Sequence, residues 1–517
     1  MGAFIEKKNR QVIPRWRTFG TTAILGELDV WPSSPPERQN TDDSLGAKIS
    51  DWQAHRTIWH ASDLLGAAVA LGREREVVDA AQFVLNSELP TPRVAKLVAA
   101  SIVAPQSRLA DLIPFSPGND TVEIYKAIHD LRRQQGDQPH NPILWVDLAL
   151  AYTILGLSEQ ADRAISVAIA RGANNRFVLR SAARFYIHSG DPDKAHRLLV
   201  NAESTPTDPW LIAAELAVAG AAGRGPVSFK GARGALSDSS LRPRDLTELA
   251  GALGTLEMEN GKAGSARKLF KLALTAPNEN AVAQAEWASE HLRGLSVDVA
   301  KFSTPRLFEA RAWDAFSKGD WSAVLRESRQ WLSDQPFSSR PAMLAAYISL
   351  EIFENHEEAD HILESSLISN PTDAILLNDL AYSYARQGRL LEAKRLLNRI
   401  DEPGLNDSTR ILVLATKGLC EFRGGRPEQG RALYLQAIDL ASKLRYRKHK
   451  AMAAINLARE EMLVRSAYAV EALQRARKES SDFPSNDVLL VLGRLNSAEH
   501  SGIQMFSDPW DQPVRTR

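Results

Sequence analysis

The chain has 517 residues, of which 44% are hydrophobic and 24% charged, a composition typical of soluble globular proteins. Its 63 basic and 63 acidic residues balance, which argues against a polyanion as the main partner because nucleic-acid-binding proteins usually carry a basic excess. The only cysteine, Cys420, excludes an internal disulfide and a cysteine-rich zinc site, so we expect a reducing, cytoplasmic setting. Neither a signal peptide nor a membrane-spanning run is visible, so we expect no membrane partner.

The first predicted segment, residues 1–45, has no helical period, and we expect an irregular, extended arm. Trp16 and Trp31 lie on it, and large apolar rings are costly to leave in water. Two placements are open. The arm either packs onto the first helices as a cap, or lies in a concave groove or reaches a partner subunit.

A period of 34 residues follows farther along the chain. Six positions recur at this spacing, Trp145, Ala149, Tyr152, Gly156, Ala161 and Ala168, and they are matched by Leu179, Ala183, Tyr186, Gly190, Ala195 and Ala202. Small residues at such positions allow two helices to cross closely, and large ones fill the spaces between them. Gly156 falls where a first helix should end, and Pro192 after Gly190 suits the first turn of a second helix.

A glycine followed five residues later by alanine recurs along the chain. The clear copies are Gly156/Ala161, Gly190/Ala195, Gly261/Ala266 and Gly388/Ala393, and the weaker ones are Gly425/Gly430, Gly319/Val324 and Gly72/Val77. With this pattern, residues 46–480 resemble the tetratricopeptide repeat family. The resemblance implies an all-α fold, a tetratricopeptide-type α-solenoid in which helix-turn-helix repeats form a right-handed superhelix.

The repeats predict five segments of unequal regularity. They are the arm at 1–45, degenerate helical repeats at 46–140, a first array at 141–300 with an irregular insert near 223–242, a second array at 301–480 with a terminal cap, and a tail at 481–517. Atypical ends are expected because terminal repeats must cap such an array.

Motifs for catalysis, cofactors or metals are weak. His356 and His361 are five residues apart, whereas a zinc-binding helix needs histidines four apart on one face. The segment 225–231 (GPVSFKG) lacks the order of glycine and lysine in a phosphate-binding loop. We therefore predict no catalytic residue, no cofactor and no metal. A cryptic enzyme would require polar groups that converge in a closed pocket.

In this fold the first helix of each repeat lines the concave groove. Three successive repeats place Trp313, Tyr347 and Tyr382 at a position that is usually groove-exposed. Neighbouring groove positions add Phe316, Arg386, Phe422, Arg423, Arg180 and Arg184. Aromatic residues and arginine are enriched at protein interface hot spots, so these nine residues are the candidate partner-binding site. The alternative is that the rings pack between adjacent helices.

The resemblance implies a non-catalytic scaffold or adaptor that binds a protein or peptide in its groove and along its arm. Bacterial proteins of this family often serve as regulatory or sensor subunits beside an enzyme, for instance in defence or secretion. The alternative is a nucleic-acid-associated regulator that uses the arginine-rich groove, Arg132, Arg133 and the basic run at 443–450. The oligomeric state does not follow from the sequence.

Overall fold

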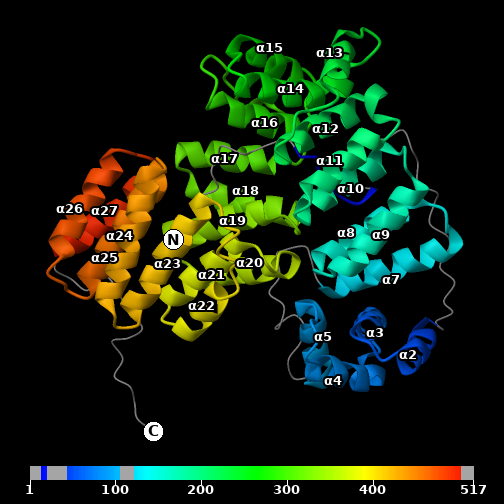
Figure 1. Ribbon diagram of the computed structural model, residues 1–517, viewed down its shortest axis with the longest axis horizontal. Coiled ribbons are helices and arrows are strands. Elements are labelled where there is room, and N and C mark those ends of the chain that lie inside the picture. The colour runs from blue at the N-terminus through cyan, green and yellow to red at the C-terminus, as the bar shows by residue number, and fades with distance from the viewer. Residues whose placement is uncertain (1–12, 20–43, 105–120, 502–517) are drawn as a thin grey trace. The chain divides into compact units, whose positions relative to one another are not determined.

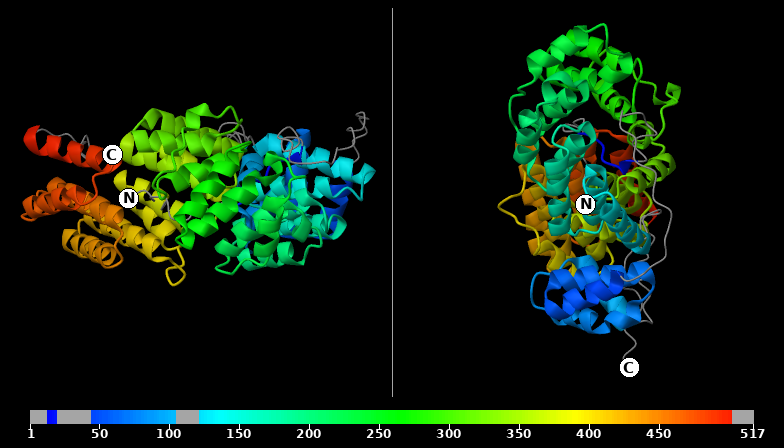
Figure 2. Two further views of the ribbon diagram at one scale, coloured as in Figure 1. Left: turned by 90° about the horizontal axis from the view of Figure 1, so that it is seen from above. Right: turned by 90° about the vertical axis from the view of Figure 1, so that its right-hand side faces the viewer.

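The computed structural model describes residues 13–19, 44–104 and 121–501 (Figures 1 and 2). The rest of the predicted arm, including Trp31, and the predicted tail beyond residue 501 lie outside these ranges. Every regular element within them is a helix, and no strand occurs there. The predicted all-α architecture of paired helices is confirmed.

Contacts within the chain divide it into two compact units, which are described separately. The N-terminal unit contains the described residues of 6–314 together with 330–338, and the C-terminal unit contains those of 315–329 and 339–517. The sequence places the boundary between its two arrays at 300/301 instead. Helices α17 (Phe308–Lys318) and α18 (Trp321–Asp334) each contribute residues to both units.

The N-terminal unit begins with four helices and a longer one, and continues as helix pairs. The first five are α2 (Ser44–Ala54), α3 (Ile58–Leu71), α4 (Val78–Asn86), α5 (Arg93–Val103) and α7 (Thr121–Asp137). The pairs are α8 (Pro142–Ile154) with α9 (Ser158–Arg171), α10 (Arg176–His188) with α11 (Pro192–Asn201), α12 (Pro209–Ala221) with α13 (Phe229–Ser237), and α14 (Thr247–Glu259) with α15 (Ala263–Ala273), followed by α16 (Glu279–Ser289). Helix α13 lies inside the insert predicted near 223–242.

Recurrent side chains set the ends of these helices. Asn141, Asn175 and Asp208 accept hydrogen bonds from the first backbone N–H groups of α8, α10 and α12, which no residue inside the helix can satisfy. The first glycine of each of the seven pairs has positive φ: Gly72, Gly156, Gly190, Gly261, Gly319, Gly388 and Gly425. In this left-handed conformation a side chain is strained, so glycine suits these positions, and Gly156 follows the end of a helix as predicted.

The C-terminal unit contains α19 (Ser339–Tyr347), which continues into a π-helical turn (Ile348–Ile352), and eight further helices. They are α20 (His356–Ser369), α21 (Ala374–Arg386), α22 (Leu390–Leu397), α23 (Asp407–Arg423), α24 (Pro427–Lys443), α25 (Arg447–Leu463), α26 (Ala469–Ser481) and α27 (Asn486–Ser501). Helix α27 lies in the predicted tail 481–517 and packs on α25 and α26, because Val488 and Leu495 give it a buried apolar face.

None of the described helices is both long enough and apolar enough to cross a membrane.

Candidate functional site

The described part of the arm packs against several helices of the N-terminal unit. Residues 13–19 (IPRWRTF) are almost entirely non-helical and form the short dark-blue segment among the green helices of Figure 1. Trp16 is 1% exposed and Phe19 2% exposed, so the unit encloses both rings. Residues 13–19 contact α8, α10, α16, α17, α18 and Phe337.

We call the residues that contact this segment the arm-binding site: Asp147, Phe177, Phe185, Glu279, Asn280, Glu309, Asp334 and Phe337.

Two arginines of the arm pair with acidic residues of the site. The buried guanidinium of Arg17 lies 2.6 Å from a carboxylate oxygen of Glu279 and 2.6 Å from one of Asp334. Arg15 forms an ion pair with Glu309. Burial opposes the charge on Arg17, but the two carboxylates hold the pKa of its guanidinium above the ordinary value. The site therefore recognises positive charge at two positions of the arm.

The aromatic rings of the arm occupy apolar positions between these charges. Trp16 packs edge-to-face against Phe185 and Phe337, with ring centroids 5.9 and 5.4 Å apart. Phe19 packs in the same way against Phe177, at 5.5 Å. On Phe337, the guanidinium of Arg184 lies 4.8 Å from the ring centroid, which is a cation–π contact.

The backbone of the arm is also held at both ends. The N–H of Phe19 donates to Asp147 at 3.1 Å, and the side-chain amide of Asn280 donates to the carbonyl of Ile13 at 3.3 Å. Because Asp147 is partly buried beneath the arm, desolvation raises the pKa of its carboxyl to about 7, against the effect of the Phe19 hydrogen bond. Contacts to backbone at both ends fix the register of the arm on the site.

Two of the predicted arginines support this site from behind. Arg180 donates to Glu248 at 2.9 Å and to the carbonyl of Trp210 at 3.1 Å. Glu248 also accepts from Asn280, which holds the arm. Arg184 covers Phe337, as described above. Sequence analysis did not identify the acidic residues that contact the arm, and a role of Arg180 and Arg184 in partner binding stays a prediction.

Trp313 and the six predicted residues of the C-terminal unit lie in intramolecular networks. Trp313, Tyr347 and Tyr382 are 0%, 2% and 0% exposed, so none of the three rings is open to solvent in this structure. Tyr347 donates to the buried Asp487 at 2.6 Å, and Tyr382 donates to Asn456 at 3.1 Å. Their role in partner binding stays a prediction.

The other four predicted residues of the C-terminal unit also pack against, or form hydrogen bonds with, side chains of that unit. Phe316 lies 6.5 Å from the ring of Tyr347, and Phe422 lies 6.1 Å from that of Tyr434. Arg386 donates to the hydroxyl of Tyr382 at 3.1 Å, and Arg423 donates to Glu460 at 2.7 Å. Phe316 and Phe422 are buried and the two arginines partly buried. The structure thus brings Tyr347, Phe316, Tyr382 and Arg386 into contact in pairs.

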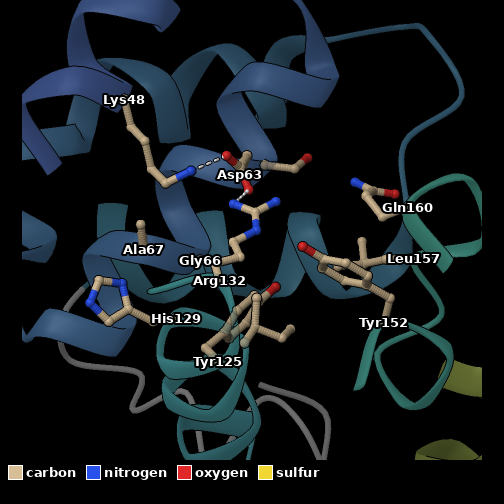
Figure 3. Close-up of a pocket in the computed structure, with 12 residues that line it drawn as sticks. Lys48, Asp63, Gly66, Ala67, Tyr125, His129, Arg132, Tyr152, Leu157 and Gln160 are labelled. Atoms are coloured by element: carbon tan, nitrogen blue, oxygen red, sulfur yellow. Dashed lines mark hydrogen bonds and ion pairs between the residues drawn. The ribbon is translucent and has the colours of Figure 1, made fainter. Parts of the chain in front are cut away.

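A second polar cluster lies between α3, α7 and α8 in the N-terminal unit (Figure 3). Asp63 forms ion pairs with Arg132, at 2.5 Å, and with Lys48. Burial would raise the pKa of Asp63, but the two cations hold it below its usual value. The ring of Tyr125 fills the space over Gly66, where a Cβ atom would lie 2.5 Å from it. These contacts join the elements of the first repeats, and sequence reasoning did not identify Asp63.

Several of the basic side chains predicted as possible nucleic-acid contacts form ion pairs within the chain. Arg132 is paired as above, Lys448 is buried against Asp487, and Lys450 lies 2.6 Å from Glu479. Among the described residues, no group of three or more His, Cys, Asp or Glu is placed to hold a metal ion.

No protein-family model and no curated protein sequence matches the chain. Solved structures resemble it in fold at low identity. Over 87% of this chain and 92% of the other, it is 11% identical to a chain of the APC/C hetero-tetramer Cut9-Hcn1, with a TM-score of 0.38. Human IFIT1, solved as a dimer with PPP-AAAA, is 15% identical over 90% and 96%, at 0.31. Yeast Tom70 is 13% identical over 74% and 94%, at 0.29. None is close enough to bear on function.

Proposed function

We propose that the protein is a non-catalytic scaffold that binds an extended segment of a protein partner at the arm-binding site. The observation that carries the proposal is that this surface already holds residues 13–19 by ion pairs, ring contacts and backbone hydrogen bonds. A preformed surface that binds charged side chains, aromatic rings and backbone groups at fixed positions limits the conformational entropy lost when an extended chain binds.

The charge of the site favours a protein over a nucleic acid. Glu279, Glu309 and Asp334 face the occupant, and carboxylates repel phosphate groups. A nucleic-acid regulator remains the second candidate because Arg445 and Arg447 of the basic run are exposed. If these arginines bind nucleic acid, the affinity should fall steeply as the salt concentration rises.

A finer assignment rests on the resemblance alone. We propose a regulatory or sensor subunit of a bacterial cytoplasmic complex, beside an enzyme of a defence or secretion system. Trp313 of the N-terminal unit stays a proposed partner-binding residue, and so do Tyr347, Tyr382 and the other predicted partner residues of the C-terminal unit. The three rings are buried and would have to become exposed before a partner could reach them.

Affinity purification from the native cell tests the scaffold. The arm-release variant is the full chain with Trp16→Ala and Arg17→Glu, which removes the central ring and reverses the buried charge of the arm. At low and high salt, this variant should capture more of a stoichiometric protein partner than the unchanged chain. Adding Glu279→Gln should abolish that capture, whereas Glu259→Gln, at an exposed position, should not.

Nucleic acid recovered alone and lost at high salt would instead support the second candidate. If the arm-release variant captures the same amount of partner with and without Glu279→Gln, the partner binds elsewhere on the chain. Circular dichroism of each variant confirms that its helices are retained.

A further inference from the structure

We infer that residues 13–19 are a built-in competitor, and that the partner displaces them with a segment of the same chemistry: arginine, aromatic, arginine, and a second aromatic residue two positions after that arginine. This inference rests on the proposed function and adds the recognition pattern and its regulation. The pattern follows from the arm itself, in which Arg15 and Arg17 form ion pairs with the site and Trp16 and Phe19 make ring contacts with it.

The acidic residues of the site require a positively charged occupant. Without the arm, Glu279 and Asp334 would lose the guanidinium that lies 2.6 Å from each of them. Glu279 is buried, and a buried carboxylate without its cation is strongly unfavourable. A neutral or acidic segment would leave that cost in place. An occupant must therefore bring a cation to the position of Arg17.

The site recognises both the shape and the charge of the guanidinium at this position. Arg17 donates from Nε and Nη2 to Asp334, at 2.9 and 2.6 Å, and from Nη1 to Glu279 at 2.6 Å. One planar fork thus reaches two carboxylates on different helices. A lysine ammonium is a point charge that lacks this fork, so the site should prefer arginine.

The ring positions define the spacing of the pattern. The ring of Trp16 contacts Phe185 of α10 and Phe337, and the ring of Phe19 contacts Phe177, also of α10. Phe177 and Phe185 are eight residues apart on one helix, which is about 12 Å along its axis. Three residues of extended chain span roughly 10 Å, which matches Trp16 to Phe19. A segment with a different spacing cannot fill both positions.

Tethering makes the arm an effective competitor. A segment that belongs to the same chain as its site has an effective concentration there on the order of 1 mM. If a free peptide of the same sequence binds the open site at roughly 10 µM, the tethered arm should weaken its apparent affinity about 100-fold. A partner gains access when the arm is loosened or when its own segment binds more tightly.

The test uses a fluorescent synthetic peptide of residues 11–21 (QVIPRWRTFGT) and two full-length proteins. Fluorescence anisotropy should show binding to the arm-release variant, and at least tenfold weaker binding to the unchanged chain. A chain with Arg293→Glu, at an exposed position, should behave like the unchanged one. The same peptide with Arg17→Glu should not bind either protein, and with Arg17→Lys it should bind the arm-release variant several-fold more weakly.

Equal binding to both proteins would overturn competition by the arm. No binding to an arm-release variant that retains its helices would overturn the recognition pattern. If that variant captures a partner through Glu279 while the peptide fails, the proposed function survives and this inference does not. If the peptide binds but no cellular protein is captured, the recognition pattern survives and the proposed function does not.

Discussion

Arg17 is the residue on which the arm-binding site is centred. Its guanidinium joins Glu279 at the start of α16 to Asp334 near the end of α18. Removing one partner of such a buried ion pair leaves the other charge uncompensated. The loss of stability is roughly 3–5 kcal/mol when the remaining charged group stays buried. Because the arm is short, release of the segment should limit the loss, so arginine changes here should expose the arm rather than unfold the unit.

Trypsin can detect that exposure directly. In the unchanged chain the peptide bonds after Arg15 and Arg17 should resist cleavage, because Trp16 between them is buried. Trp16→Ala removes the contacts with Phe185 and Phe337 and should raise cleavage at both bonds at least tenfold, as measured by mass spectrometry. Leu89→Ala, at a side chain that is 62% exposed, is the control and should leave both bonds protected. Equal cleavage in all three proteins would contradict a bound arm.

Asp147, which accepts a hydrogen bond from the arm, should make the stability of the protein depend on pH. Its pKa is raised from 3.8 to about 7, so the folded protein retains a proton that the unfolded chain has lost. Stability should therefore fall as pH rises from about 4 to 7 and change little above that. Asp147→Asn removes the charge and can keep the oxygen that accepts from Phe19. We expect it to match the unchanged chain near pH 4 and to be more stable by roughly 1–3 kcal/mol at pH 8.

Chemical denaturation at pH 4, 6 and 8 measures this difference. A constant difference between the two proteins at all three values would show that Asp147 does not titrate as described.

At the scale of elements, glycine has two separate roles in these helix pairs. At helix ends, such as Gly190, it adopts positive φ. At the crossing of α23 and α24 it allows backbones to touch, because a Cβ atom on Gly430 would lie 2.7 Å from the carbonyl oxygen of Gly418 and 2.5 Å from the ring of Phe422. Gly430 stands where stronger repeats have alanine, and the tight crossing explains the replacement.

Gly430→Ala should therefore destabilise the C-terminal unit by roughly 1–3 kcal/mol, through overpacking at this crossing. Gly264→Ala is the matched control, since Gly264 is helical and exposed and a Cβ atom there would meet nothing within 4 Å. The control should be neutral or slightly stabilising, because alanine favours the helix. Thermal unfolding compares the two, and equal midpoints would contradict the close crossing.

The rings of Trp313, Tyr347 and Tyr382, which the repeat pattern predicts in the groove, offer a second test at this scale. Trp313→Ala, Tyr347→Ala and Tyr382→Ala should each lower the free energy of unfolding by roughly 3–5 kcal/mol, because each ring is buried. Urea denaturation measures the change. A variant that keeps its stability and loses partner binding would instead establish the ring as an interface residue.

Across the whole molecule, the sequence predicted the fold better than the site. The glycine and alanine pattern predicts helix pairs because a helix end and a close crossing each restrict one position locally. The arm-binding site depends on contacts between residues such as Arg17 and Asp334, which are 317 positions apart and have no common period. The Arg-Trp-Arg run of the arm was a visible signal, but its acidic partners lie at unrelated positions of separate helices.

The most direct test of the central claim, that the arm is bound to its own chain, is a double-mutant cycle between Arg17 and Glu279. Arg17→Met, Glu279→Gln and the double variant are compared with the unchanged chain by urea denaturation. If the two side chains form the 2.6 Å ion pair, the double variant should lose less stability than the sum of the single losses, by at least 1 kcal/mol. Additive losses, within about 0.5 kcal/mol, would show that the arm does not occupy this site.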